Sequence, residues 1–203
     1  MAQLYATSLF APNPLSNGGT YINAWQDYAN DNGSVSSEIY RVPGTAWVSG
    51  VNAGTWAKSA RSVATVSGVF SVVLRGQKAM FAYLGLNNEA VVSYPGTRYA
   101  RAKYAFVSNF TGPGTAQVSR PNELGVVKGS SRTWSASESA LAVAICDTGT
   151  EIVYKVSGDN GATWTLHYTS VAAYVPNDVY RIDVGSIFAN QALVVEVYPS
   201  VLV

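Results

Sequence analysis

The sequence predicts an all-β protein: an antiparallel β-sandwich or jelly roll with an extended N-terminal arm and at most one short helix. From about residue 35 onward, short apolar runs rich in β-branched and aromatic residues follow one another along the chain. Turn residues separate these runs, as in GPG (112–114), DTGT (147–150) and PND (176–178). Many short strands divided by turns, with little helix, are typical of antiparallel sandwiches and barrels.

The 203 residues fit one large β domain, because no linker rich in proline, serine or charge divides the chain. Residues 1–19 contain two prolines and a pair of glycines among small and polar residues, and we expect an extended arm there. Residues 20–203 then form a single sandwich domain with an apolar C-terminal tail, VYPSVLV (197–203). This tail is either the last strand of the core or a contact with another subunit. The absence of a repeat of fixed period argues against a propeller.

The one expected helix lies in TYINAWQDYAND (20–31). Thr20 can cap it, and Ile22, Trp25 and Ala29 share one face at helical spacing. The aromatic and asparagine residues of this segment favour a strand or loop almost as strongly.

The strands expected after this segment are apolar or alternating runs. They are SGVFSVVL (67–74), KAMFAYLGL (78–86), TRYARAKYAFVSN (97–109), LGVVK (124–128), LAVAIC (141–146), EIVYKVS (151–157), WTLHYTSV (164–171), DVYRIDV (178–184) and ALVVEVY (192–198). Alternation in 97–109 places Tyr104 and Phe106 on one face and Lys103 on the other. We therefore expect a half-buried strand with one face in water or against a partner.

The composition limits the class of partner. Charged residues make up 12% of the chain, about half the usual share, and hydrophobic residues make up 48%. The net charge is +1 and no cluster of Lys and Arg occurs, so we expect no binding to nucleic acid. The start of the chain lacks the pattern of a signal peptide, and no apolar run approaches the ~20 residues of a membrane span. We therefore expect synthesis in a cytoplasm, no membrane insertion, and close association with other protein.

The motif SGDNGATW (157–164) lies between two expected strands and predicts the turn of a hairpin. Asp159 can accept backbone N–H bonds within the turn, and Gly161 can supply a positive φ. Thr163 can add a hydroxyl bond, and the ring of Trp164 can fold back over the turn.

With Ser157 at its first position, this motif matches the pattern Ser/Thr-x-Asp-x-Gly-x-Thr-Trp and resembles the Asp-box of sialidases and related β-propellers. In that family the box is a structural turn that lies far from the catalytic cleft and is usually repeated. Here it occurs once, in a chain too short for a six-bladed propeller. The resemblance therefore implies a folding role rather than sialidase activity.

Catalytic and metal sites are not predicted. His167 is the only histidine, and strand alternation places it on the face opposite Leu166 and Tyr168. Cys146 is the only cysteine and lies in an apolar run, so we expect a buried thiol and no zinc cluster. No paired-carboxylate motif or phosphate-binding loop is present. We expect no enzyme activity, no catalytic residue and no cofactor.

Calcium is the metal for which most oxygen ligands are present. Asp147, Glu151 and Asp159 could bind it if their loops met at one end of the sandwich, whereas residues 27–38 do not fit an EF-hand loop. We predict no metal site.

The best candidates for ligand or partner contact are Trp47, Trp56 and Trp134, which lie in segments rich in Ser, Gly and Ala. Exposed tryptophans stack on sugar rings and are enriched at protein interfaces. The alternative is that these three rings close the ends of the sandwich.

The segment GTRYARAKYAFVS (96–108) resembles strands in β-sandwich modules of bacteriophage tail and fibre proteins. This resemblance implies a non-enzymatic virion structural or host-attachment protein: a capsid decoration, tail or fibre component. Such a protein assembles in the host cytoplasm as a homo-oligomer, contacts other virion proteins through its arm and tail, and can bind a host-surface glycan. The alternative is a carbohydrate-binding, lectin-like module, and a more remote alternative is a small glycan-active hydrolase.

Overall fold

The computed structural model describes residues 20–21, 25–27, 39–42, 45–48, 58–76, 81–88, 102–109, 117–135, 138, 141–186 and 191–203. Within these ranges the chain forms sixteen β-strands and no helix, so the predicted all-β class is confirmed. The same ranges contain no helix long and apolar enough to cross a bilayer. The predicted arm, residues 1–19, lies outside them.

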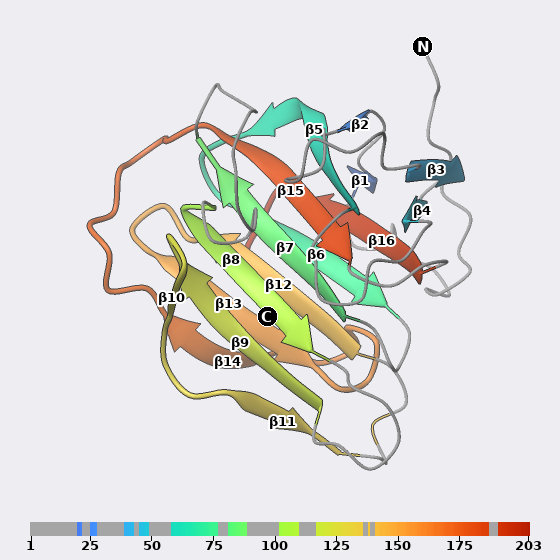
Figure 1. Cartoon of the computed structure of the whole chain (residues 1–203). Coiled ribbons are helices and arrows are strands. Elements are labelled where there is room, and N and C mark those ends of the chain that lie inside the picture. The colour runs from blue at the N-terminus through green and yellow to red at the C-terminus, as the bar shows by residue number, and fades with distance from the viewer. Residues whose placement is uncertain are drawn as a thin grey trace.

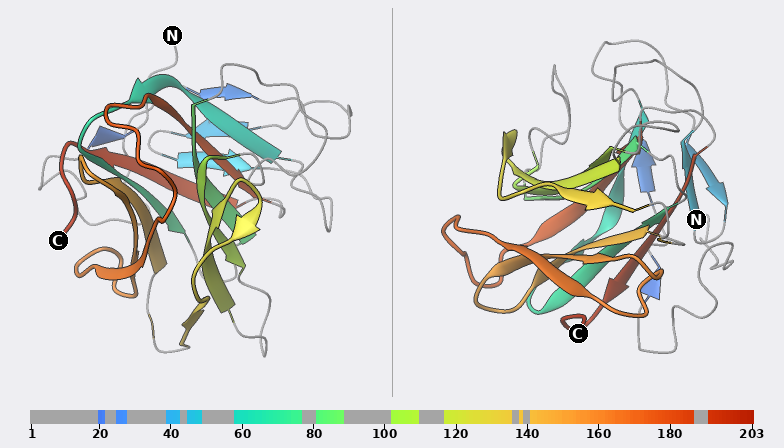
Figure 2. Two further views of the ribbon diagram at one scale, coloured as in Figure 1. Left: turned by 90° about the vertical axis from the view of Figure 1, so that its left-hand side faces the viewer. Right: turned by 90° about the horizontal axis from the view of Figure 1, so that it is seen from below.

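The strands form two antiparallel sheets that face each other (Figures 1 and 2). Sheet A has the order β14-β13-β12-β6-β16-β4-β3, with β1 also paired to β16. Its strands are β1 Thr20–Tyr21, β3 Ile39–Val42, β4 Thr45–Val48, β6 Phe70–Gly76, β12 Leu141–Asp147, β13 Ile152–Ser157, β14 Thr165–Thr169 and β16 Gln191–Tyr198.

Sheet B has the order β10-β9-β8-β7-β15-β5-β2, with β11 also paired to β9. Its strands are β2 Trp25–Asp27, β5 Lys58–Val66, β7 Phe81–Asn87, β8 Tyr104–Asn109, β9 Gln117–Glu123, β10 Val126–Val127, β11 Arg132–Trp134 and β15 Tyr180–Ser186. The chain crosses between the sheets several times, as expected for a sandwich rather than a simple meander.

The main core lies between the sheets, where alternate residues of each strand point inward. Aromatic rings join the two layers: Phe106 of β8 meets Tyr154 of β13 edge-on, with 5.7 Å between ring centroids. Phe70 of β6 meets Tyr180 of β15 in the same way at 6.2 Å. Burial of each such side chain stabilises the fold by about 1.5–3 kcal/mol.

A second apolar cluster covers the outer face of sheet A. Val73, Ala144 and Cys146 lie at its centre, and Tyr198 and Leu202 pack over them. The last five residues therefore fold back over their own sheet, and the chain ends beside its outer surface (Figure 2). Of the two alternatives for the C-terminal tail, the strand and its own sheet account for the burial of Tyr198 and Leu202.

Three local predictions are wrong. Residues 20–21 and 25–27 are strands rather than parts of a helix, because pairing with β16 and β5 outweighs the local helical periodicity. The expected strand 124–128 contains a tight turn with Leu124 at φ 48° and Gly125 at φ 82°, which separates β9 from β10. In β8 both faces are buried, so the expected wet face is absent: Ala105 on its outer side is as inaccessible as Phe106 on its inner side.

Candidate functional site

The SGDNGATW motif forms the connection between β13 and β14, and its side chains bind its own backbone. Asp159 accepts hydrogen bonds from the Thr163 N–H at 3.0 Å and from the Thr163 hydroxyl at 2.7 Å. The Ser157 hydroxyl donates to Asp159 at 2.6 Å and accepts from the Gly161 N–H at 2.7 Å. Asn160 and Gly161 have φ of 61° and 87°, so the chain reverses within two left-handed residues.

These hydrogen bonds favour the ionised form of Asp159. The hydroxyls of Ser157 and Thr163, followed by the backbone of Thr163, lower the pKa of Asp159 to about 2. The carboxylate therefore stays charged throughout the neutral and mildly acidic range, and its role is to hold the turn.

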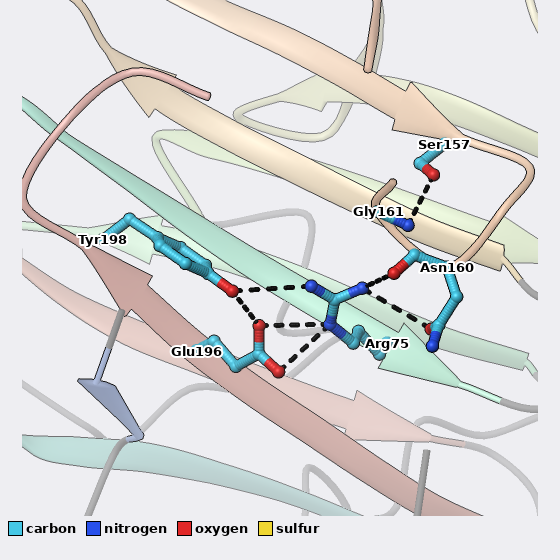
Figure 3. A network of polar contacts seen from close by, with 6 residues as sticks. All are labelled: Arg75, Ser157, Asn160, Gly161, Glu196 and Tyr198. Carbon is cyan, nitrogen blue, oxygen red and sulfur yellow. Dashed lines mark hydrogen bonds and ion pairs between the residues drawn. The ribbon is translucent and has the colours of Figure 1, made fainter. Parts of the chain in front are cut away.

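Arg75 on the outer face of sheet A fastens this turn to the sheet (Figure 3). Its Nε donates to both carboxylate oxygens of Glu196, at 3.0 and 3.1 Å, while Nη1 donates to the backbone oxygen of Asn160. The Tyr198 hydroxyl donates to Glu196 at 2.5 Å. Glu196 is completely buried, so this ion pair is withdrawn from water between the sheet and the turn. Trp164 packs beside it against the outer cluster. The network supports the fold.

Of the three predicted tryptophans, Trp134 is the one whose side-chain surroundings lie within the described part of the chain. Trp134 in β11 is only 5% exposed, its Nε1 donates to the Ser119 hydroxyl at 2.7 Å, and the Arg132 guanidinium lies 5.0 Å from its ring centroid. Of the two alternatives stated for this ring, Trp134 therefore follows the second, in which it is not exposed and packs into the core. Trp47 lies in β4 opposite Tyr40 and Ala192. Trp56 lies outside the described residues.

His167 does not follow the predicted alternation. A β-bulge opposite Tyr154 and Lys155 adds one residue to β14, so His167 and Tyr168 both turn toward the core. The His167 ring lies 5.8 Å from that of Phe106, and its Nε2 lies 2.9 Å from the backbone oxygen of Ser130. Burial lowers the pKa of His167, which keeps the imidazole neutral at pH 7. The histidine closes the edge between the sheets.

A partly exposed polar cluster occupies the opposite end of the sandwich from the SGDNGATW turn. Asn88 follows β7, Lys103 precedes β8 and Asp178 precedes β15, and these three strands are neighbours in sheet B. Asp178 Oδ2 accepts from Lys103 Nζ at 2.8 Å and from Asn88 Nδ2 at 3.0 Å. We name Asn88, Lys103 and Asp178 the Asp178 cluster.

The charges within this cluster are balanced and partly open to solvent. The side chains of Lys103 and Asp178 are 20% and 17% exposed. Burial acts to raise the pKa of Asp178, but the hydrogen bond and the charge of Lys103 outweigh it, so the pKa is lowered overall. The Lys103 ammonium also lies 5.5 Å and 5.7 Å from the ring centroids of Tyr104 and Tyr180.

Exposed aliphatic side chains flank the Asp178 cluster and form what we call the apolar rim. Leu124 is 64% exposed and its N–H donates to the oxygen of Ala102, the residue before Lys103. Val175 and Val179, on either side of Asp178, are 47% and 49% exposed. A carboxylate, an amide and an ammonium bordered by apolar side chains can bind a small polar molecule that also has an apolar face.

The sequence patterns did not single out these residues as a site, because Lys103 lies within the expected strand 97–109, Asn88 follows the expected strand 78–86 and Asp178 lies in the PND turn. The only available signal was the recurrence of polar residues at strand ends, as in the PND turn. The three carboxylates considered as calcium ligands do not meet at one end of the sandwich. Asp147 and Glu151 lie at one end of β13, and Asp159 lies beyond the other end. The described residues contain no group of three or more His, Cys, Asp or Glu side chains that could hold a metal ion.

No protein-family model and no curated protein sequence matches the chain. Solved structures do match. The exoplasmic/lumenal domain of VIP36, in its Ca2+/Man3GlcNAc-bound form, has a TM-score of 0.59, with 8% identity over 100% of this chain and 90% of that chain.

Two other structures are similar in the same way. A legume lectin-like domain from Entamoeba histolytica has a TM-score of 0.54 and 10% identity, over 87% of this chain and 90% of that chain. The PSpry domain of TRIM65 has a TM-score of 0.51 and 12% identity, over 84% and 89%. The chain therefore shares the legume-lectin-like β-sandwich fold.

Proposed function

We propose that this protein is a non-catalytic carbohydrate-binding domain and that it binds sugar at the Asp178 cluster. The observation that carries the proposal is the match of the whole chain to a lectin-like sandwich, since the VIP36 domain was crystallised with mannose-containing ligands. Because the TRIM65 PSpry domain has the same fold, the fold alone does not select a ligand. The chemistry of the Asp178 cluster supplies the second argument.

Sugars present hydroxyl groups on their edges and C–H groups on their faces, and the Asp178 cluster with its rim complements both. The Asp178 carboxylate accepts hydrogen bonds from hydroxyls, while Lys103 and Asn88 hold it in place and offer further polar atoms. The aliphatic rim of Leu124, Val175 and Val179 can cover the apolar face of the ring. No step of this recognition requires a nucleophile or a general base.

The test is binding of the purified protein to a glycan array, followed by titration calorimetry with the best glycan. We expect Asp178→Asn to weaken binding at least tenfold, because about 1.5–3 kcal/mol is typical of a hydrogen bond to a charged group. The control Glu151→Gln removes an exposed carboxylate from the β12–β13 turn and should leave affinity within about twofold.

The possible outcomes separate the two parts of the proposal. If no glycan binds, the carbohydrate-binding function is wrong. If a glycan binds wild type and Asp178→Asn equally, the function stands and the site lies elsewhere.

The hypothesis of a virion structural or attachment protein stays a prediction. A glycan-binding domain on a virion would satisfy both hypotheses, since a virion can attach to its host through surface glycans. Light scattering of the full chain tests the oligomer that this hypothesis requires, and a monomer would contradict it.

A further inference from the structure

The protein itself occupies most of the acceptor capacity of Asp178. Its Oδ2 atom accepts from Lys103 and Asn88, at 2.8 and 3.0 Å. Its Oδ1 atom accepts from the Val179 N–H at 3.0 Å, and Tyr180 adds a hydrogen bond to the same carboxylate. Because a carboxylate has about four lone-pair positions, little of Asp178 is left to accept from a ligand.

Lys103 and Asn88, in contrast, have donors to spare. An ammonium has three N–H groups and a side-chain amide has two, and among the described residues each side chain gives one of them to Asp178. The remaining N–H groups are the polar groups that the Asp178 cluster offers to a ligand. The site therefore favours a ligand group that accepts hydrogen bonds and brings few donors of its own.

The charges of the cluster favour a neutral ligand group. Lys103 Nζ lies 2.8 Å from Asp178 Oδ2, so the opposite charges nearly cancel. A ligand carboxylate attracted by Lys103 is repelled by Asp178, and a ligand ammonium meets the reverse. A carbonyl oxygen accepts from N–H groups without a net charge, and unlike a hydroxyl group it brings no hydrogen that must find an acceptor.

The apolar rim favours a small, compact apolar group beside that carbonyl. Leu124, Val175 and Val179 are branched aliphatic side chains, and every large apolar side chain exposed in the described part of the chain is a valine or a leucine. The flat C–H face of a sugar ring packs best on the flat face of an aromatic ring. A methyl group packs well against branched aliphatic side chains.

Leu124 occupies a position for which the turn itself favours asparagine. Leu124 and Gly125 form a two-residue loop between the paired residues Glu123 and Val126, and both have positive φ, 48° and 82°. Such loops most often contain Asn-Gly, because asparagine adopts a positive φ with less strain than leucine. The Leu124 side chain is 64% exposed, so packing within the fold does not account for a leucine here. Contact with a ligand does.

We propose that the Asp178 cluster binds an N-acetylated amino sugar, an inference that rests on the proposed function. The acetamido carbonyl oxygen accepts from Lys103 or Asn88, and the acetamido methyl group packs against the apolar rim. The acetamido N–H requires only one acceptor, which matches the small remaining capacity of Asp178.

The first test compares sugars that differ only in the acetamido group. Titration calorimetry of the full chain compares the methyl glycosides of N-acetylglucosamine and glucose, and those of N-acetylgalactosamine and galactose. We expect the N-acetylated sugar to bind at least about tenfold more tightly in at least one pair, because it adds a hydrogen bond to a polar side chain and a buried methyl group. The methyl glycosides of glucosamine and glucuronic acid test whether the site selects a charge instead.

The outcomes separate this inference from the proposed function. Equal affinity within both pairs, or tighter binding of a charged glycoside, overturns the inference and leaves carbohydrate binding in place. Binding on the glycan array that is confined to glycans without an acetamido group overturns it in the same way. A complete absence of glycan binding contradicts the proposed function itself.

The second test uses Leu124→Asn, which removes the exposed side chain and suits the turn. We expect the urea midpoint to stay or rise, because asparagine relieves backbone strain. Affinity for the N-acetylated sugar should fall at least about threefold, and affinity for the parent hexose should stay within about twofold.

Leu166→Asn is the matched control for this variant. Leu166 is 56% exposed and lies in β14 of sheet A, paired with Lys155, whereas the Asp178 cluster lies at strand ends of sheet B. Both affinities should be unchanged in this control. An unchanged affinity for the N-acetylated sugar in Leu124→Asn, or equal losses for the two sugars, contradicts the contact between the methyl group and the apolar rim.

Discussion

The contact between the SGDNGATW turn and Arg75 predicts that Gly161 is intolerant of substitution. A Cβ atom added at Gly161 would lie 2.8 Å from Arg75 Nη2 and closer still to Nη1. The φ of 87° adds backbone strain for any residue with a side chain. Gly161→Ala therefore combines two costs, and the chain offers a glycine that separates them.

Gly68 is this control. It has a φ of 74°, but no atom lies within 4 Å of the position of its Cβ. Gly68→Ala should thus carry only the cost of the left-handed backbone, about 1–2 kcal/mol. At Gly161 the same strain is joined by displacement of Arg75, which donates to Asn160 and pairs with the buried Glu196. Loss of one charged hydrogen bond adds about 1.5–3 kcal/mol, so we expect a total of about 3–5 kcal/mol.

Thermal and urea unfolding, followed by circular dichroism, measure the difference. In a domain of this size each kcal/mol shifts the melting temperature by about 2–4 °C, so Gly161→Ala should melt roughly 6–20 °C below wild type and Gly68→Ala roughly 2–8 °C below. Equal losses in the two variants would refute the role assigned to Arg75. Tolerance of alanine at Gly161 would refute the geometry of the turn.

Three further predictions concern pH and salt. The pKa of Asp159 is lowered to about 2, so the stability that its carboxylate contributes is fully present above its ordinary pKa near 3.8 and is lost as the pH falls through 2. The urea midpoint of the Asp159→Asn variant should therefore depend less on pH between about 4 and 2 than that of the wild type. The pKa of His167 is also lowered, so the unfolded chain binds the proton more readily and stability should decline below about pH 6.5. His167→Gln should reduce that decline, and an unchanged profile would contradict the burial of the ring. Sugar affinity should change little between low and moderate salt, because the opposite charges of Lys103 and Asp178 cancel. A steep fall of affinity with salt, measured by calorimetry, would indicate binding at a site with a net charge and would contradict the Asp178 cluster as the sugar site.

The sequence predicts the fold class and the apolar strands of the core, because β-rich runs and turns are local properties. β5 is missed, since its sequence KSARSVATV is polar. Its Arg61 is nevertheless buried, because Asp183 accepts from it twice, at 2.7 and 2.9 Å. No local pattern reveals a charge whose partner lies 122 residues away.

The same reason explains the errors at the candidate sites. The SGDNGATW turn is encoded within eight residues, so its internal bonds can be anticipated from the sequence. The Asp178 cluster depends on three strand ends that meet only in the sheet. The inward turn of His167 depends on a single extra residue in one strand, which alternation cannot anticipate.

The C-terminal residues that fold back over sheet A give the protein an intrinsic reporter. Cys146, the only thiol of the chain, lies in the outer cluster beneath Leu202 and is fully shielded. Burial raises the pKa of this thiol, which further slows its reaction with water-soluble reagents. The rate of thiol labelling therefore measures how often these last residues lift away from the sheet, without any engineered probe.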